Sequence, residues 1–354
     1  MFFANRIVAW QRNHGRHDLP WQNTTDPYRI WLSEIMLQQT QVATVMGYYA
    51  RFLERFPDIA TLAAAAQEDV MPYWAGLGYY ARARNLHRCA QTLMSDWGGQ
   101  FPPTAEQIAT LPGIGPSTAA AIAAFSFGEQ SPIMDGNVKR VFTRHFGIEG
   151  DPTRREVEQR LWAIARHEVD TLRVGRLDMP AYTQGLMDMG ATLCTRRQPA
   201  CTQCPVQASC VAAQQGRQHE LPTARVRKTA QTRQTAMLLI HDQANVLLTL
   251  RPSPGIWGGL WSLPECTPGE QEEAIGLLCG DQPARPIAMA AFEHVFTHFR
   301  LHIQPWHVEI DLATPEAVAA PLRWFARSEL AALGLPAPVR KLVDGLLAQD
   351  LLGT

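Results

Sequence analysis

The stretch LPGIGPSTA, residues 111–119, decides the fold of the amino-terminal half of the chain. Its glycines, Gly113 and Gly115, let the backbone turn tightly and approach a ligand closely. The next helix, expected from Pro116 to Phe125, begins with unpaired N–H groups that suit a phosphate. The turn alone fits equally well a helix-hairpin-helix grip on a nucleic-acid backbone and a plain connection between two packed helices.

Helical periodicity surrounds this turn from about residue 27 to residue 213. Pro27 opens a helix whose apolar stripe continues past Gly47 to Phe56. Thr104 and Gln107 form a capping box just before the turn. We therefore expect an all-helical first domain.

Beyond a basic stretch with few apolar residues, the spacing of the apolar residues changes from helical to alternating. Residues 237–240 and 246–250 predict a β-hairpin, and residues 295–303 alternate as a strand does. Helices are expected near 270–278 and 338–347. With 354 residues, the chain should hold two domains: a helical domain at 1–213, a linker at 214–233 and an α+β domain at 234–354.

Composition narrows the class of protein. The chain is 46% apolar and 18% charged, and no apolar run approaches the roughly 18 residues needed to cross a bilayer. Its amino end is broken by polar residues before a signal-peptide core could form, so we expect a cytoplasmic protein. The net charge of −1 leaves nucleic-acid binding open, because a local basic strip would suffice.

Four of the seven cysteines lie close together in the pattern Cys194-x6-Cys201-x2-Cys204-x5-Cys210. In a reducing compartment such clustering favours a metal site over disulfides. A structural zinc site more often pairs two Cys-x2-Cys knuckles, so the compact loop favours an iron-sulfur cubane, with zinc and unliganded thiols as alternatives. We expect the cluster to be structural, and Arg196 and Arg197 to project from its longest loop toward a phosphate backbone.

The hairpin, the segment MDGNVKR at 134–140 and the cysteine loop together resemble the endonuclease III, or helix-hairpin-helix, superfamily of DNA glycosylases. Residues 31–41, WLSEIMLQQTQ, and 76–85, GLGYYARARN, narrow the resemblance to the adenine DNA glycosylase (MutY) family. The similarity runs from about Leu19 through Cys210 and continues more weakly to the carboxyl end. It implies a 4Fe-4S cluster and, as substrate, double-stranded DNA with adenine opposite 8-oxoguanine or guanine.

Two carboxylates are the catalytic candidates. Glu34 lies among apolar residues, which would raise its pKa as a proton donor requires, although an isolated glutamate on a helix is more often exposed. Asp135 precedes a helix, where it could be an N-cap whose helix keeps the carboxylate ionised. The resemblance implies that Glu34 protonates a flipped adenine and that Asp135 balances the sugar cation, electrostatically or covalently.

Other positions follow from the resemblance. Tyr79 and Gln39 would wedge the opened duplex beside the opposing base, although each could be an ordinary packing residue. Bifunctional relatives carry a lysine where this chain has Ser117, so the resemblance implies no strand cleavage. The remaining positions that we expect against DNA are Gly113, Gly115, Ser117, Asn137, Arg196 and Arg197.

The carboxy-terminal domain resembles the Nudix fold without its magnesium site. Gly259 and Glu265 imitate the start of a Nudix box, but the segment at Glu272 and Glu273 lacks the required acidic pairs. In the family, a Phe-Ser-His loop contacts 8-oxoguanine, and this chain has Phe296, Thr297 and His298 there. His298 could equally be a solvent-facing strand residue.

These features favour a monofunctional adenine glycosylase that acts as a monomer on DNA at the bacterial nucleoid. The alternatives are a lesion-binding protein without catalysis, a bifunctional glycosylase and lyase, and a nucleotide pyrophosphohydrolase centred on the second domain. A binding protein would require Glu34 or Asp135 to be exposed and apart, whereas a pyrophosphohydrolase would require acidic metal ligands that the second domain lacks.

Overall fold

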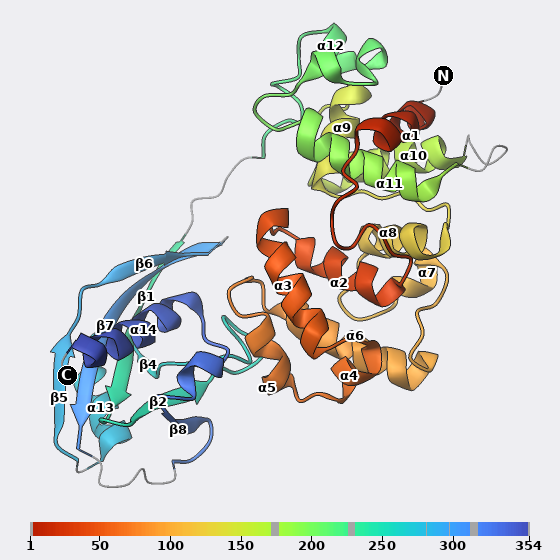
Figure 1. Cartoon of the computed structure of the whole chain (residues 1–354). Helices are drawn as coiled ribbons and strands as arrows, with labels where there is room; N and C mark the ends of the chain where they lie inside the picture. Colours follow the sequence, from red (N-terminus) through yellow and green to blue (C-terminus); the bar gives the residue numbers. More distant parts are fainter. Residues whose placement is uncertain are drawn as a thin grey trace. The chain divides into compact units, whose positions relative to one another are not determined.

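The computed structural model describes residues 3–170, 177–225, 231–280, 282–296, 298–311 and 318–352. The chain forms two compact units (Figure 1). Unit 1 comprises Met1–Ala64 and Asn85–Arg227, and unit 2 comprises Ala65–Arg84 and Lys228–Thr354. The sequence analysis placed residues 65–84 in the first domain, whereas their contacts group them with the carboxy-terminal part of the chain.

Unit 1 is helical, as predicted. The boundary between the units falls inside α6 (Ala81–Trp97), after Arg84. The other elements of unit 1 are α1 (Phe3–His14), α2 (Pro27–Leu37), α3 (Val42–Arg55), α4 (Ile59–Ala64), α7 (Ala105–Ile108), α8 (Pro116–Phe127), α9 (Gly136–His145), α10 (Arg155–Asp170), α11 (Met179–Asp188), the π-helix η3 (Met189–Leu193), the 3-10 turns η4 (Cys201–Gln203) and η5 (Gln207–Ser209), and α12 (Val211–Gln214).

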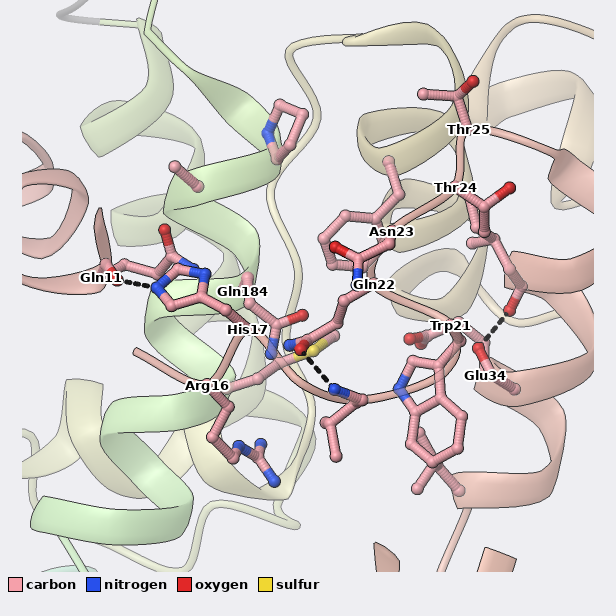
Figure 2. A pocket seen from close by; sticks show the side chains of 18 of the residues that line it. Gln11, Arg16, His17, Trp21, Gln22, Asn23, Thr24, Thr25, Glu34 and Gln184 are labelled. Atoms are coloured by element: carbon pink, nitrogen blue, oxygen red, sulfur yellow. Dashed lines mark hydrogen bonds between the residues drawn. The ribbon is translucent and has the colours of Figure 1, made fainter. Parts of the chain in front are cut away.

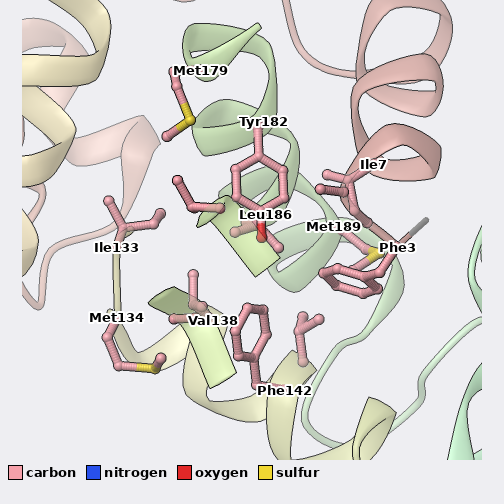
Figure 3. Packing of buried hydrophobic residues seen from close by; sticks show 14 of the residues in the cluster. Phe3, Ile7, Ile133, Met134, Val138, Phe142, Met179, Tyr182, Leu186 and Met189 are labelled. Carbon is pink, nitrogen blue, oxygen red and sulfur yellow. The ribbon is translucent and has the colours of Figure 1, made fainter. Parts of the chain in front are cut away.

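A core of large apolar side chains joins the first helix to later ones. Phe3 of α1 packs edge-on against Phe142 of α9, with ring centroids 5.7 Å apart. Tyr182 of α11 is 1% exposed in the same cluster (Figure 3). Burial of such a side chain stabilises a fold by about 1.5 to 3 kcal/mol, so this cluster fixes α9 and α11 firmly.

The helix expected from Pro27 to Phe56 is two helices, α2 and α3. Between them, Gln39 has a φ of 58°, in the left-handed region that an α-helix excludes. The apolar stripe alone could not reveal this break, because the stripe resumes after it. The N-cap half of the predicted capping box is confirmed, because Thr104 Oγ1 accepts from Gln107 N at 3.3 Å. The Gln107 side chain accepts from Thr104 Oγ1 at 2.9 Å.

Unit 2 is an α+β domain built on an eight-stranded sheet. Its main path runs β3-β2-β1-β7-β5, while β4 pairs with β1, β6 with β7 and β8 with β2. The bounds are α5 (Gln67–Val70), η1 (Met71–Tyr73), β1 (Gln231–His241), β2 (Asn245–Leu250), β3 (Trp261–Ser262), β4 (Glu265–Cys266), α13 (Gln271–Cys279), β5 (Ala284–Ala288), β6 (Phe292–Val295), β7 (Phe299–Ile310), β8 (Leu322–Ala326), η6 (Leu330–Ala332) and α14 (Ala337–Leu352).

Two strand assignments differ from the sequence analysis. The first strand begins at Gln231, inside the expected linker, because residues 231–241 pair in parallel with Phe299–Glu309 of β7. The expected strand at 295–303 contains a turn instead: Phe296 N donates to Phe299 O at 2.9 Å, which closes a hairpin between β6 and β7. Long-range pairing decides both cases, so local alternation could not show them.

Across the described ranges, none of the helices has both the length and the apolar character needed to cross a membrane.

Candidate active site

A cavity of about 370 Å³ opens in unit 1 (Figure 2). Side chains from α1, α2, α11 and the segment between α1 and α2 line it. Figure 2 shows Glu34 and Trp21 on one side and Gln11, His17 and Gln184 on the other. Polar groups therefore converge on an apolar wall, which is the usual composition of a small-ligand site.

Glu34 lies on α2 with its side chain at the cavity wall. Its neighbours Trp31, Ser33 and Ile35 are almost completely buried. Burial, together with the smaller effect of the negative charge of Asp135, raises the pKa of Glu34 to about 8. At neutral pH the carboxyl is mostly protonated, so it can donate a proton.

Asp135 is the N-cap of α9, as predicted: its Oδ1 accepts from Val138 N at 2.7 Å. The predicted depressed pKa is wrong. Burial raises the pKa of Asp135, although the backbone N–H groups of Val138 and Asn137 and the cations Arg140 and Lys139 all act to lower it.

The sequence analysis missed the group that orients the far wall. Asp188, on α11, is completely buried and accepts from Arg16 Nε at 2.7 Å and from Gln184 Nε2 at 2.8 Å. Arg16 and Gln184 both line the cavity. A buried carboxylate four residues after a glutamine on one helix is the local signal, but the arginine comes from a segment 172 residues away.

The hairpin has the geometry that its glycines predicted. Gly113 has a φ of 77°, and a side chain there would meet Asn85 at 2.5 Å. Gly113 and Gly115 are exposed, so their backbone can reach a ligand. Ser117 instead points inward: its Oγ accepts from Met134 N at 2.9 Å, which joins the hairpin to the residue before Asp135.

The four clustered cysteines line a single small pocket and are free thiols. Burial raises the pKa of Cys204 to about 11, and its three partner cysteines also act on it. No group of three or more His, Cys, Asp or Glu within the described residues is arranged to hold a single metal ion.

Two arginines of α9 hold this cysteine loop. Arg140 Nε donates to Cys194 O at 2.7 Å, and Arg140 Nη2 donates to Asn137 Oδ1 at 2.9 Å. Arg144, 3% exposed, donates to Cys194 Sγ at 3.3 Å and to Thr195 O at 2.7 Å. Arg196 and Arg197 are exposed at the loop, as expected. Asn137, expected to contact DNA, thus makes an internal contact.

Within unit 2, the turn that carries Tyr79 is tightly held. Tyr79 has a φ of 49° and is 43% exposed. Arg82 Nη2 donates to Leu77 O and to Gly78 O, each at 3.2 Å, and its guanidinium lies 5.5 Å from the centre of the Tyr79 ring. Burial lowers the pKa of Arg82 to about 10. The exposed aromatic ring thus stands on a rigid base.

The Nudix-like positions are not gathered into a metal site. Glu265 forms an ion pair with Arg251 at 2.7 Å, while Glu272 and Glu273 are exposed on α13. At the tip of the β6–β7 hairpin, Phe296 is partly buried and His298 is exposed. His298 lies between the two strands and not on either of them. Thr297 lies outside the described residues.

Comparison with known proteins agrees with this geometry. Residues 32–167 match the family model of the HhH-GPD superfamily base excision DNA repair protein, and residues 235–345 match that of the NUDIX domain. The adenine DNA glycosylase of Buchnera aphidicola subsp. Acyrthosiphon pisum is 33% identical, over 97% of this chain and 97% of its own length. The human adenine DNA glycosylase is 32% identical, over 96% of this chain and 73% of its own length.

Among solved structures, a thermostable thymine-DNA glycosylase aligns with a TM-score of 0.52 and 28% identity, over 60% of this chain and 95% of its own. The matches to curated enzymes along nearly the whole chain, the matched repair domain and the buried Glu34 carboxyl at the cavity wall lead to the same conclusion. The chain belongs to the adenine DNA glycosylase family.

Proposed function

We propose that the enzyme hydrolyses the N-glycosidic bond of adenine opposite 8-oxoguanine or guanine, and that it does not cut the DNA strand. The observation that carries this proposal is the carboxyl of Glu34 at a cavity wall, with a pKa of about 8 beside the capped carboxylate of Asp135. The cavity of about 370 Å³ has room for a purine base.

In this mechanism, adenine leaves the base stack, at a cost of a few kcal/mol, and enters the cavity. Glu34 protonates the base as the bond between C1′ and N9 breaks, and the bonding electrons stay with adenine. Asp135 balances the positive charge that develops on the sugar. Water then supplies the hydroxyl group at C1′, and its released proton restores Glu34.

The inward contact of Ser117 supports a monofunctional enzyme. A lyase needs an amine that attacks C1′ and forms a Schiff base. Ser117 offers only a hydroxyl group, which accepts a hydrogen bond from Met134 N. Lys139, the single lysine in the sequence of unit 1, forms an ion pair with Glu158 at 2.6 Å. Hydrolysis by water is therefore the chemistry that these residues favour.

We propose that Cys194, Cys201, Cys204 and Cys210 hold a 4Fe-4S cluster. Support comes from their shared pocket and from the two arginines that fix the loop around them. When bound, the cluster would add a cross-link that stiffens the loop. Arg144 and Arg140 then hold the exposed Arg196 and Arg197 in position for a phosphate backbone.

The residues proposed to bind DNA in unit 1 are the exposed glycines of the hairpin, the two loop arginines and Gln39. Gln39 and Tyr79 both have left-handed backbones, a strained state for a residue with a side chain that is commonest at functional positions. We propose that both fill the opened duplex beside the opposing base. The exposed His298 and its neighbours in unit 2 would contact that base.

The test uses the full-length enzyme and two duplexes, each with one adenine, opposite 8-oxoguanine in one and guanine in the other. After single-turnover incubation, half of each sample is heated with alkali and the strands are sized. We expect breaks at the adenine only after alkali, with faster release opposite 8-oxoguanine. Breaks before alkali would indicate a lyase, and no breaks at all would leave a binding protein.

A further inference from the structure

Three described residues other than glycine have a left-handed backbone: Gln39, Tyr79 and Trp257. The first two were singled out from the sequence as lesion contacts, but nothing in the sequence pointed to Trp257. It has a φ of 56°, which is strained for a residue with a side chain, and it is 6% exposed, so its side chain is held inside unit 2. Surrounding contacts must enforce this conformation.

Trp257 lies in the loop between β2 and β3 and supports the β6–β7 hairpin. Its ring centre is 5.4 Å from that of Phe296 and 5.7 Å from that of His294. Phe296 in turn stacks on Phe299 at 4.4 Å, with an angle of 19° between the rings. These aromatic contacts fix Phe296 and Phe299, which flank the hairpin tip. His298, at the tip, is exposed.

The same loop is bound on another side by the amino-terminal segment of unit 2. Arg84 Nη1 donates to Gly258 O, the residue after Trp257, at 2.6 Å. A side chain at Gly259 would meet Gln67 at 3.1 Å and Met71 at 3.9 Å, so the loop backbone packs closely on residues 67–84. Arg84 is 174 residues from Gly258 in the sequence.

Arg84 also belongs to the helix start that follows Tyr79. Arg82 N donates to Tyr79 O at 2.8 Å, and Arg84 N donates to Tyr80 O at 3.2 Å. The Tyr79 turn and the hairpin tip are therefore linked through one chain of contacts inside unit 2. This chain runs from the helix start through the Arg84 guanidinium, the Gly258 carbonyl and the Trp257 ring to Phe296.

We propose that Arg84 and Trp257 are positioning residues that set the Tyr79 turn and the β6–β7 hairpin tip in register with each other, so that both read the base opposite adenine at once. This inference rests on the proposed function, in which those two elements contact that base. Neither residue takes part in bond breaking, so the effect should appear as lost discrimination between opposing bases and not as lost chemistry.

The test compares single-turnover release of adenine opposite 8-oxoguanine and opposite guanine in the full-length enzyme. Arg84→Met keeps the apolar stem that packs near Gly259 but removes the donor to Gly258 O. Trp257→Phe keeps an aromatic ring but shortens its reach toward Phe296. We expect each to lower the ratio of the two rates, Arg84→Met by roughly tenfold, the size of one lost hydrogen bond to a charged group, and Trp257→Phe by less.

Three comparisons make the result specific. Arg84→Lys should restore part of the ratio, since it retains a cationic donor. Arg323→Met is the matched control, because it makes the same replacement at an exposed arginine of unit 2 that lies over the ring of Phe325 at 4.6 Å, outside the chain of contacts. It should leave the ratio unchanged. The double variant Arg84→Met with Trp257→Phe should lose less than the product of the single losses.

Equal slowing on both duplexes, an unchanged ratio, or multiplicative losses in the double variant would each overturn the inference. The proposed specificity is judged separately, on the wild-type enzyme. If the wild type shows no preference for 8-oxoguanine, that proposal fails before any variant is made. Equilibrium binding of the same duplexes in a Glu34→Gln background gives a second measurement of the ratio without turnover.

Discussion

The acidic residues that we singled out in the two units lie in opposite environments. In unit 1, Glu34 lies at a cavity wall with a pKa of about 8, near a second carboxylate that caps a helix. In unit 2, Glu265 is neutralised by Arg251 at 2.7 Å, and Glu272 and Glu273 face solvent. Burial and a nearby like charge both raise the pKa of a carboxyl toward the value that a proton donor needs. The Glu34 carboxyl of unit 1 experiences both effects.

Backbone strain separates the proposed recognition residues from the proposed catalytic ones. Gln39 of unit 1 and Tyr79 and Trp257 of unit 2 have left-handed backbones, whereas the two catalytic candidates sit on or before regular helices. In the proposed mechanism, chemistry relies on the electrostatics of ordinary helix positions, and recognition relies on loops whose backbones are held in one conformation. The predictions below test this division, beginning with the largest effect.

Glu34→Gln should lower the rate of adenine release by about 100 to 10,000-fold, because the amide fills the same space but cannot act as an acid. Duplex affinity should stay nearly unchanged. Single-turnover assays and equilibrium binding measure the two quantities, with the exposed Glu54→Gln on α3 as a control that should behave like the wild type. A Glu34→Gln enzyme that keeps the full rate would remove Glu34 from the mechanism.

Asp135→Asn should also be nearly inactive, since an amide cannot balance a sugar cation. Asparagine caps helices about as well as aspartate, so α9 should remain folded, and thermal unfolding should confirm this. The single-turnover rate is the decisive measurement. Undiminished cleavage by a folded Asp135→Asn enzyme would reduce Asp135 to a structural cap.

The pH profile tests the environment of Glu34. The group donates a proton only when protonated, and burial raises its pKa to about 8. The single-turnover rate should therefore hold up to about pH 8 and fall above it. An ordinary glutamate would lose this activity above about pH 5. A decline that begins near pH 5 would show that water reaches the Glu34 carboxyl and that burial does not raise its pKa.

Cys201→Ser should weaken DNA binding by loosening the loop that presents Arg196 and Arg197. The wild-type protein should be brown and hold about four irons per chain. Cys266→Ser, outside the cluster in unit 2, is the control and should keep both iron and affinity. Stoichiometric zinc without iron in anaerobically prepared protein would refute the cluster.

The sequence predicted the hairpin, the capping residue Asp135 and the cysteine loop, because each depends on contacts within a few residues. It could not predict the break at Gln39 or the parallel pairing of β1 with β7. The grouping of residues 65–84 with unit 2 also depends on Arg84 meeting Gly258, 174 residues away. Likewise, the pKa of Asp135 reflects packing by other elements, which outweighs its helix cap.

Ser117→Lys should produce the smallest effect and tests whether the hairpin of unit 1 could support other chemistry. A lysine there would offer an amine near C1′, but it would lose the hydroxyl that accepts from Met134 N at 2.9 Å and so loosen the chain before Asp135. We expect a little covalent complex on borohydride trapping, together with slower adenine release. The wild type should give almost none, and its strand breaks should require alkali. Ser117→Ala, which loses the same contact without adding an amine, separates the two effects: it should slow release similarly and trap nothing. Efficient trapping by the wild type would show that another lysine acts as a nucleophile, and that the water mechanism drawn from Glu34 and Asp135 is incomplete.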